Sequence, residues 1–154
     1  MNKLAAPWLA NYGKVPFHLE YPQGSMVDEL AKIADQYPNN IAFDFMGRST
    51  SYRQMLAGID QAARSFAAIG IKENDKVTIC MPNTPQAVCC FYGLNRLGAV
   101  ANMIHPLSSE GEIIFYLQDS DSVAALTLDQ FYPKFAAIQQ QTKLPKLIRS
   151  ESVV

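Results

Sequence analysis

Residues 76–104 read KVTICMPNTPQAVCCFYGLNRLGAVANMI, and this stretch decides the fold. It opens with a short apolar run at 76–81 that has the composition of a buried strand. Thr84 follows, a residue type that caps helices, and the proline after it is typical of the first helical position. The helix predicted from there is apolar nearly all round, which indicates burial on more than one side, and it stops at Gly98. Because a second β-rich run comes at 100–104, the stretch predicts two parallel strands joined by a right-handed crossover.

The same alternation continues on both sides of this unit. Ser109 and Glu112 have the spacing of a capping box, and an apolar stripe from Tyr52 to Ile69 predicts the most regular helix. From residue 52 onward helices and strands alternate, which predicts a doubly wound α/β fold with a mainly parallel sheet and helices on both faces. The expected elements are helices at 25–37, 52–69, 85–97, 109–118 and 133–141, and strands at 41–45, 76–81, 100–104, 123–128 and from 147. A further short strand is expected to follow a turn at 46–48 and to reach residues 50–51.

The first 24 residues lack such a pattern and are rich in proline, glycine and aromatic residues. We therefore expect residues 1–24 to form an irregular arm that lies on the surface of the domain, with Trp8 and Phe17 as packing anchors. Residues 25–154 are expected to form one domain, because a chain of 154 residues is long enough to bury a sizeable core.

Composition and charge exclude several classes of protein. The chain is 49% hydrophobic and 18% charged, as in a folded globular protein. Its formal net charge of −1 gives no support to a nucleic-acid or anionic-membrane partner. No apolar run approaches the roughly 20 residues of a transmembrane helix, and the amino-terminal stretch does not resemble a secretory signal. We expect a cytoplasmic protein.

The three cysteines, Cys80, Cys89 and Cys90, form no C-x-x-C pair. We interpret them as reduced, buried, small hydrophobic residues, since vicinal cysteines rarely form a structural disulfide and free cysteine is among the most buried residue types. Only His18 and His105 could join them, at no zinc-like spacing, so no metal site is predicted.

Ligands of doubly wound folds bind beyond the carboxyl ends of the strands. The residues expected there, 82–84, 105–108 and 129–130, are mostly proline, asparagine, histidine and serine. The chain contains neither G-x-G-x-x-G nor G-x-x-x-x-G-K-S/T, the glycine-rich motifs that hold dinucleotides and phosphates. It also lacks a nucleophile elbow and paired carboxylates. We therefore assign no catalytic residue.

His105 is the most informative single residue at these ends, because it directly follows a strand and precedes Pro106. It has two interpretations: contact with a substrate or nucleotide, or a hydrogen bond to the backbone of its own loop. Together with Pro106 and Ser108 it is our candidate for a position close to substrate. The hydroxyl of Thr84 is better explained as a helix cap than as a catalytic group.

Residues 50–55, 70–77 and 105–107 resemble, in order and spacing, signatures of the adenylate-forming (AMP-dependent synthetase and ligase) superfamily. Within it, the chain is most similar to bacterial fatty-acid–CoA ligases. It departs from the usual pattern at four positions where Glu, Gly, Asn and Tyr are common, namely Gln54, Asn74, His105 and Ser108. The other stretches that carry the resemblance are 7–9, 40–43, 81–86, 94–100 and 128–134.

This resemblance implies an AMP-forming acyl-CoA synthetase. A carboxylate attacks the α-phosphate of ATP in the presence of Mg²⁺, which gives acyl-adenylate and pyrophosphate, and the thiol of coenzyme A then takes the acyl group. The family's phosphate-binding loop, its ribose-binding Asp and its catalytic Lys have no counterpart in this chain. We therefore expect residues 25–154 to be a partial AMP-binding domain that ends before that loop, is inactive alone, and has no ATP, Mg²⁺ or coenzyme A bound to it.

Two other interpretations stay open. A free-standing, non-catalytic domain that binds an acyl group, coenzyme A or a protein partner would have the same fold. An amino-acid-activating adenylation domain would share the signatures. We also expect an unpaired sheet edge and an exposed apolar patch, through which two copies could form a homodimer.

Overall fold

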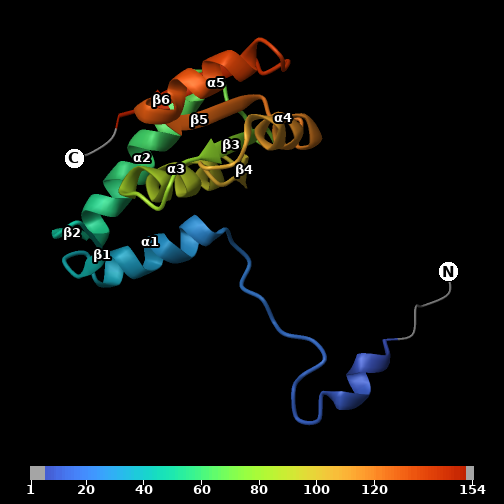
Figure 1. The fold of residues 1–154 in the computed structure, drawn as a ribbon. Helices are drawn as coiled ribbons and strands as arrows, with labels where there is room; N and C mark the ends of the chain where they lie inside the picture. Colours follow the sequence, from blue (N-terminus) through green and yellow to red (C-terminus); the bar gives the residue numbers. More distant parts are fainter. Residues whose placement is uncertain (1–5, 152–154) are drawn as a thin grey trace.

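The computed structural model describes residues 6–151 and contains the helices and strands in the predicted order (Figure 1). Two short 3₁₀ helices, η1 (Pro7–Asn11) and η2 (Asp129–Phe131), were not predicted. The α-helices are α1 (Met26–Gln36), α2 (Tyr52–Ala68), α3 (Pro85–Arg96), α4 (Glu110–Asp119) and α5 (Tyr132–Gln139). The strands are β1 (Ile41–Phe45), β2 (Arg48–Ser51), β3 (Lys76–Cys80), β4 (Val100–Met103), β5 (Ala124–Leu128) and β6 (Lys146–Ser150).

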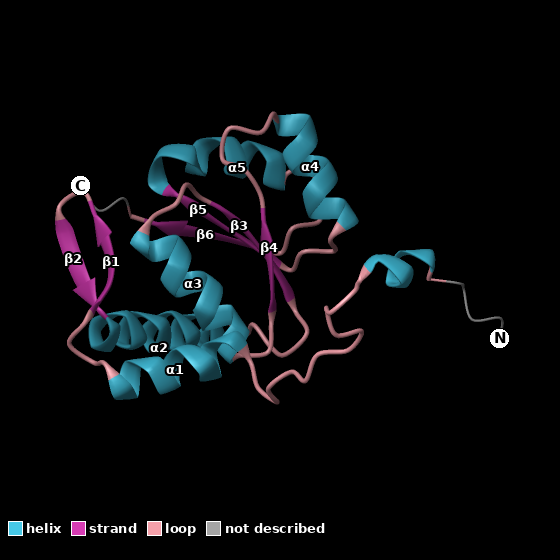
Figure 2. Ribbon diagram, turned by 90° about the horizontal axis from the view of Figure 1, so that it is seen from below, coloured by secondary structure: helices cyan, strands magenta, loops and turns pink. Residues whose placement is uncertain are grey.

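Four parallel strands form the main sheet, in the order β4-β3-β5-β6. Helices α1, α2 and α3 lie on one side of this sheet, and α4 and α5 lie on the other (Figure 2). The predicted doubly wound α/β fold with a parallel sheet is therefore confirmed. Strands β1 and β2 form a separate antiparallel hairpin. The connection from β4 to β5 passes across β3, which leaves β4 and β6 at the two edges of the sheet.

Two apolar clusters form most of the core, one on each face of the sheet. The cluster under α2 and α3 contains Phe66, Ile79 and Leu94. The cluster under α4 and α5 contains Ile113 and Phe135. Strand β5 is buried along its whole length, as expected for a central parallel strand that is covered by helices on both faces.

Side-chain caps fix the start of most helices. Ser25, Ser51 and Ser109 each accept a hydrogen bond from the backbone N–H three residues later, and the side chain of that later residue accepts one from the serine N–H. These reciprocal bonds are capping boxes. The hydroxyl of Thr84 accepts a hydrogen bond from the N–H of Ala87 at 3.3 Å, so its interpretation as the cap of α3 is confirmed.

Acid is expected to weaken two of these caps. The hydrogen bonds from Ser25 and Ser109 lower the pKa of Asp28 and of Glu112 below their ordinary values. A carboxylate whose pKa is lowered by folding stabilises the native state above its ordinary pKa, and this contribution is lost as the pH falls through the lowered value. The urea midpoint should therefore fall below about pH 4.5, the range in which such carboxyl groups take up protons.

The variant Glu112→Gln should reduce this pH dependence, because it removes the titrating group of the α4 cap. Glu110→Gln is the matched control: it removes a carboxylate from the same first turn, outside the capping box. Urea unfolding at several pH values compares the three chains. Equal pH profiles for Glu112→Gln and the parent would contradict this account of the cap.

Helices α2 and α3 approach closely because glycine lies at their contact. A Cβ atom on Gly93 would lie 2.9 Å from the Cβ of Ala62 and 3.0 Å from the backbone nitrogen of Ala63. A Cβ atom on Gly58 would lie 2.8 Å from the Sγ of Cys89. Real Cβ atoms essentially never lie closer than 3.0 Å to another heavy atom, so a side chain at either position would force a neighbour to move. At Gly93 the neighbours belong to the packed α2 helix, whereas at Gly58 the neighbour is the end of a side chain.

A chain of hydrogen-bonded polar side chains connects β4, β3 and the loop between α4 and β5. Thr78 Oγ1 and Ser122 Oγ lie 2.7 Å apart, and the side-chain amide of Asn102 donates to Thr78 Oγ1 at 2.9 Å. Ser122 Oγ is also 2.7 Å from Ser120 Oγ, which donates to the carbonyl of Tyr116 at 2.6 Å. Thr78 and Ser122 are buried, so these bonds satisfy groups that water cannot reach.

The arm differs from our expectation. Residues 6–24 extend away from the α/β domain instead of lying on it (Figure 1). Trp8 is 58% exposed and Phe17 is 59% exposed, so the prediction that they anchor the arm to its own domain was wrong. Phe17 has a ring neighbour within the arm itself, Tyr12, at a centroid distance of 5.8 Å. The aromatic residues of the arm therefore pack locally and leave most of their surface in solvent.

The cysteines are free thiols, as expected. Cys80 is fully buried, whereas Cys89 and Cys90 are half-buried, so the predicted burial is complete only for the first of them. Burial raises the pKa of Cys90 to about 12, and the neighbouring Cys89 adds to the shift. Among residues 6–151, no helix has both the length and the hydrophobicity that crossing a membrane requires.

Candidate functional site

A pocket of about 570 Å³ lies at the carboxyl edge of the sheet. The chain leaves β3 towards β4 and leaves β5 towards β6, on the opposite side, so the connections diverge between β3 and β5. Such a divergence is where doubly wound folds bind ligands. The residues that line the pocket lie at the end of β4 or in the segments after β3, β4 and β5, and they are Met81, Pro82, Asn83, Met103, Ile104, His105, Pro106, Leu107, Gln130 and Phe131.

His105 lies at the rim of this pocket and is exposed. Its Nδ1 accepts a hydrogen bond from the backbone N–H of Leu107 at 3.2 Å, which leaves Nε2 to carry the proton of the neutral ring. The second interpretation of His105, a bond to its own loop, is therefore present in the structure. The bond does not exclude the first interpretation, because Nε2 stays available to a ligand.

Three further contacts hold the loop that carries His105. The backbone N–H of Ser108 donates to the carbonyl of His105 at 3.1 Å, and Lys134 Nζ donates to the carbonyl of Ser108. Cys80 Sγ lies 3.6 Å from the His105 carbonyl oxygen. Burial raises the pKa of Cys80 to about 11, so its thiol is protonated at neutral pH and acts as the donor.

Of the three residues predicted to lie close to substrate, two line the pocket and one does not. His105 and Pro106 line the pocket, with Pro106 buried beneath the loop. Ser108 is not among the lining residues, and its carbonyl is turned to Lys134. Its role in the described geometry is to close the turn after His105.

Replacing His105 with asparagine is expected to leave the stability of the chain nearly unchanged. Asparagine at the first position of a turn accepts a hydrogen bond from the N–H two residues later, which is the bond that His105 Nδ1 now accepts. His105→Ala removes the acceptor and should cost about 1 kcal/mol. Urea unfolding of both variants measures the difference. An equal loss in the free energy of unfolding for His105→Asn and His105→Ala would contradict the proposed turn.

The chemistry of the pocket is that of a site for an uncharged group. Its lining residues include apolar side chains, two amides and one imidazole, and none of them is Lys, Arg, Asp or Glu. A triphosphate requires cations or a nest of backbone donors, so these residues do not fit the phosphates of a nucleotide. Within residues 6–151 there is also no cluster of three His, Cys, Asp or Glu side chains that could hold a metal ion.

Sequence reasoning missed the apolar half of this pocket. Met81, Met103, Ile104 and Phe131 line it, but each resembled the ordinary end of a strand or the start of the next element. Their position beside the predicted strand ends was the available signal, because the side chains at parallel strand ends face one another across the crevice.

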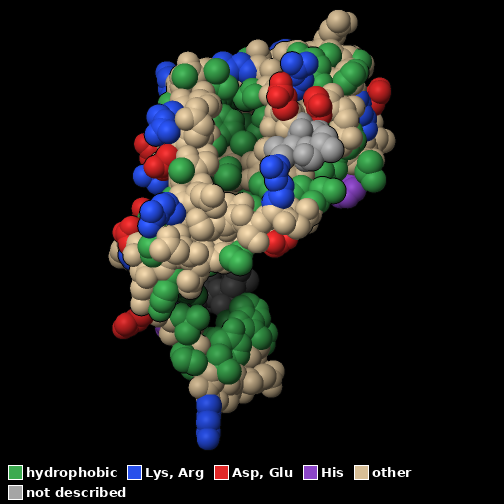
Figure 3. All heavy atoms as spheres, turned by 90° about the vertical axis from the view of Figure 1, so that its left-hand side faces the viewer, with side chains coloured by type: hydrophobic (Ala, Val, Ile, Leu, Met, Phe, Trp, Pro, Cys, Tyr) green, Lys and Arg blue, Asp and Glu red, His purple; other side chains and the backbone are tan. Residues whose placement is uncertain are grey.

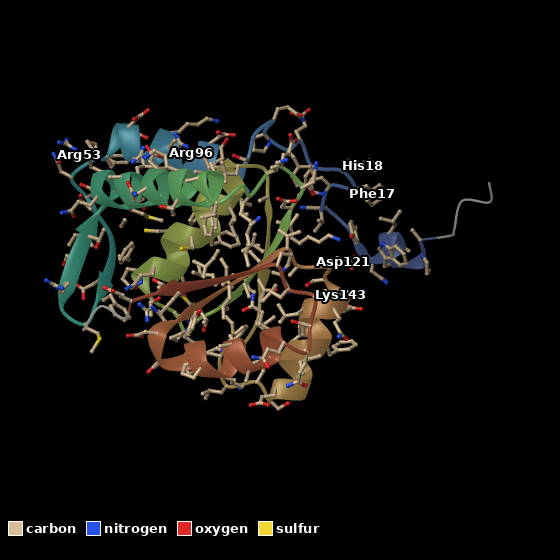
Figure 4. The ribbon with its side chains drawn as sticks, turned by 90° about the horizontal axis from the view of Figure 1, so that it is seen from above. Phe17, His18, Arg53, Arg96, Asp121 and Lys143 are labelled. Carbon is tan, nitrogen blue, oxygen red and sulfur yellow. The ribbon has the colours of Figure 1, made fainter. Side chains whose placement is uncertain are left out.

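A second cavity, of about 540 Å³, lies at the opposite edge, between the ends of α4 and α5. Asp121 and Lys143 are among the residues that line it, and they come from two different loops (Figure 4). Asp121 forms an ion pair with Lys76 at 3.7 Å, and its side chain is 84% exposed. This cavity lies at the amino ends of the strands, where the fold does not position ligands.

Comparison with known proteins decides the family. Residues 30–154 match the sequence family described as AMP-binding enzyme, which is most of the chain. The chain belongs to this AMP-binding enzyme family. The resemblance to the adenylate-forming superfamily is thereby confirmed.

The similar curated proteins of this family are CoA ligases. The long-chain-fatty-acid–CoA ligase of Bacillus subtilis (strain 168) is 30% identical over 137 residues, which cover 88% of this chain and 24% of that protein. The crotonobetaine/carnitine–CoA ligase of Escherichia coli O157:H7 is 33% identical over 91 residues, 59% of this chain and 18% of that protein. The chain therefore spans about a quarter or less of the length of these AMP-binding enzymes.

Solved structures of the family have the same fold. The inhibitor-bound N-terminal domain of FACL13 from Mycobacterium tuberculosis superposes with a TM-score of 0.76 at 30% identity, over 82% of this chain and 33% of that one. A long-chain-fatty-acid–CoA ligase (FadD1) from Archaeoglobus fulgidus gives a TM-score of 0.78 at 21% identity, over 86% of this chain and 28% of that one. The second likeness is one of fold alone.

Proposed function

We propose that this chain is the amino-terminal part of an AMP-forming acyl-CoA synthetase that acts on a fatty acid. The main support is the similarity to the Bacillus subtilis long-chain-fatty-acid–CoA ligase, which extends over 88% of the chain. Further support comes from the segments at 7–9, 105–107 and 128–134, in which the sequence resembles the fatty-acid branch. In the whole enzyme a carboxylate and ATP give acyl-adenylate and pyrophosphate, and coenzyme A then takes the acyl group.

The contribution of this chain to that reaction is binding and orientation. The pocket at the carboxyl edge suits an uncharged part of a substrate, such as the acyl chain, because its lining is apolar with a few neutral polar groups. We assign His105 to contact with that substrate through Nε2, and Pro106 and Ser108 to the shape of the loop beneath it.

We further propose that the chain is inactive alone. The nucleotide's phosphates and Mg²⁺ need charged groups that the described residues do not gather, so those groups belong to other parts of the whole enzyme. ATP, Mg²⁺ and coenzyme A are accordingly assigned to the whole enzyme, which we place in the cytoplasm.

Release of pyrophosphate tests this function. The full-length protein is given ATP, Mg²⁺, coenzyme A and one carboxylate from a panel of long-chain, short-chain, aromatic and amino acids, and the isolated 154-residue chain is assayed in parallel. We expect turnover by the full-length protein with a preference for fatty acids, and no turnover by the isolated chain.

Each of the other outcomes contradicts part of the proposal. A preference for amino acids would identify an adenylation domain. Turnover by the isolated chain would refute its inactivity. A reading frame that stops after codon 154, together with a chain that binds coenzyme A without turnover, would support a free-standing binding domain.

A further inference from the structure

Lys134 lies where its own helix disfavours a cation. It belongs to the first turn of α5, and the positive end of the helix dipole repels a positive charge there. On the face shown in Figure 3, lysine and arginine side chains lie apart from one another at the surface, where water solvates them. Lys134, in contrast, is half-buried, and it forms no ion pair among residues 6–151. A residue that conflicts with its local surroundings indicates a contact that is needed elsewhere.

The contact that Lys134 makes is with the loop of the candidate site. Its Nζ donates a hydrogen bond to the carbonyl oxygen of Ser108. We call residues 105–108 the His105 loop; His105 and Pro106, in this loop, line the pocket at the carboxyl edge of the sheet. A hydrogen bond from a charged donor is stronger than one between neutral groups. The ammonium group therefore fastens the His105 loop to α5.

The pKa values of two neighbouring groups agree with this position. Burial raises the pKa of Cys80 to about 11, against a smaller lowering by the charge of Lys134. Hydrogen bonds with Ser109 lower the pKa of Glu112, and the charge of Lys134 adds to this lowering. Cys80 ends β3 and Glu112 lies in the first turn of α4, so the ammonium group is close to both elements that flank the His105 loop.

The bond from Lys134 to Ser108 joins two walls of the pocket. One wall is the His105 loop, and another is formed by Gln130 and Phe131, which belong to the connection between β5 and α5. Lys134 lies three residues after Phe131, in the first turn of the helix to which this connection leads. Neither Lys134 nor Ser108 is a lining residue, so the bond crosses from wall to wall outside the space that a ligand would fill.

We propose that Lys134 is a positioning residue: its bond to Ser108 holds the His105 loop against the segment before α5 and thereby fixes the size of the acyl group that the pocket admits. This inference rests on the proposed function, because it takes the pocket as the site of the acyl chain. Lys134 acts through the loop and does not touch the substrate. Without the bond the two walls can separate, so the pocket fits its preferred fatty acid less closely and distinguishes chain lengths less well.

The kinetics of the full-length protein test this role. Lys134→Met removes the donor and keeps most of the length of the side chain. With octanoate, dodecanoate and hexadecanoate as the carboxylates, we expect the KM for the best substrate to rise about tenfold at a nearly unchanged kcat, because the acyl chain is bound but does not react. The ratio of kcat/KM between the best and the worst fatty acid should fall about tenfold. A general loss of folded enzyme would instead lower the apparent kcat and leave KM unchanged.

Two variants are matched to Lys134→Met. Lys134→Arg keeps a charged N–H donor, and a single carbonyl acceptor needs only one, so this variant should restore most of the parent's KM and chain-length preference. Lys143→Met removes an exposed lysine from the loop after α5, at the amino ends of the strands, and should leave both constants unchanged. Circular dichroism and the thermal midpoint check that each variant is folded. Equal increases in KM for Lys134→Arg and Lys134→Met would contradict the role of the hydrogen bond.

Hydrogen exchange measures the attachment of the loop without turnover. The N–H groups of Leu107 and Ser108 form hydrogen bonds within the His105 loop, so the exchange of a peptide that covers the loop reports its opening in the full-length protein. In Lys134→Met this exchange should be about tenfold faster, because a charge-assisted bond that closes the loop is lost. In Lys143→Met it should equal that of the parent.

The two measurements separate failure of this inference from failure of the proposed function. Unchanged exchange in Lys134→Met would overturn the inference, whichever substrate the enzyme uses. Faster exchange with an unchanged chain-length preference would overturn the selection of the acyl group by Lys134. If the parent released no pyrophosphate with any fatty acid, the proposed function would fail, and hydrogen exchange would still decide whether Lys134 holds the loop.

Discussion

Replacing Gly93 with valine should strongly destabilise the domain. A Cβ atom at this position would meet the backbone nitrogen of Ala63 at 3.0 Å, and a backbone atom inside α2 cannot move aside as a side chain can. Overpacking of this kind costs about 1–3 kcal/mol, and the two methyl groups of valine place the variant at or above the upper end. The thermal midpoint and the urea midpoint should both fall sharply.

Two other glycines serve as controls for this prediction. Gly111, in the first turn of α4, has no atom within 4 Å of an added Cβ, so Gly111→Ala should be neutral or stabilising by up to about 1 kcal/mol. Gly58→Ala should cost less than Gly93→Ala, because its obstacle is the Sγ of Cys89, which can rotate away. If the Gly93→Val variant unfolded at the same midpoint as the parent, α2 and α3 would not be packed as closely as the Gly93–Ala63 contact indicates.

The second large effect is expected at Thr78. Thr78→Val keeps the shape of the side chain but removes the acceptor of the Asn102 amide, and it leaves Ser122 Oγ with its contact to Ser120 alone. A buried polar group without a partner costs about 1–3 kcal/mol, so we expect a loss of about 2 kcal/mol in the free energy of unfolding.

Thr127→Val is the matched control for Thr78→Val. Thr127 is also fully buried, on the adjacent strand β5, but its hydroxyl lies outside this polar chain and donates to the carbonyl of Cys80 at 3.1 Å. Loss of this hydrogen bond should lower the free energy of unfolding by about 1 kcal/mol. Ser122→Ala should lower the free energy of unfolding less in the Thr78→Val background than in the parent, because the effects of substitutions at coupled residues do not add. Additive losses would show that the hydroxyl chain is not a unit.

Local pattern was enough to predict most of the fold. Thr84 and Ser109 cap their helices as their types and spacings indicated, because a cap depends only on a short stretch of backbone. The parallel sheet followed from the order of helices and strands, since a crossover has one favoured hand. The separation of the β1–β2 hairpin from the main sheet was not predicted, because pairing partners distant in sequence leave no local signal.

The candidate site was predictable in place but not in content. His105 and Pro106, which follow a predicted strand end, line the pocket, and their proximity to a substrate stays a prediction. The carbonyl of Ser108 accepts from Lys134, a contact between residues 26 positions apart that no local pattern indicates. The arm was mispredicted for a related reason. Aromatic residues indicate burial on average, but Trp8 and Phe17 lie on an arm that extends away from the domain, and both are more than half exposed.

The strand order also bears on how the chain folds during synthesis. Three of the four strands, β3, β4 and β5, are complete once residue 128 has emerged from the ribosome, and β6 is then added beside β5. The roughly twenty residues that lead to the end of β6 take on the order of a few seconds to translate. Helices and loops form in microseconds, so the partial sheet has time to assemble before its last strand arrives. Growth in this order leaves β6 as the last strand to pair, along the free side of β5.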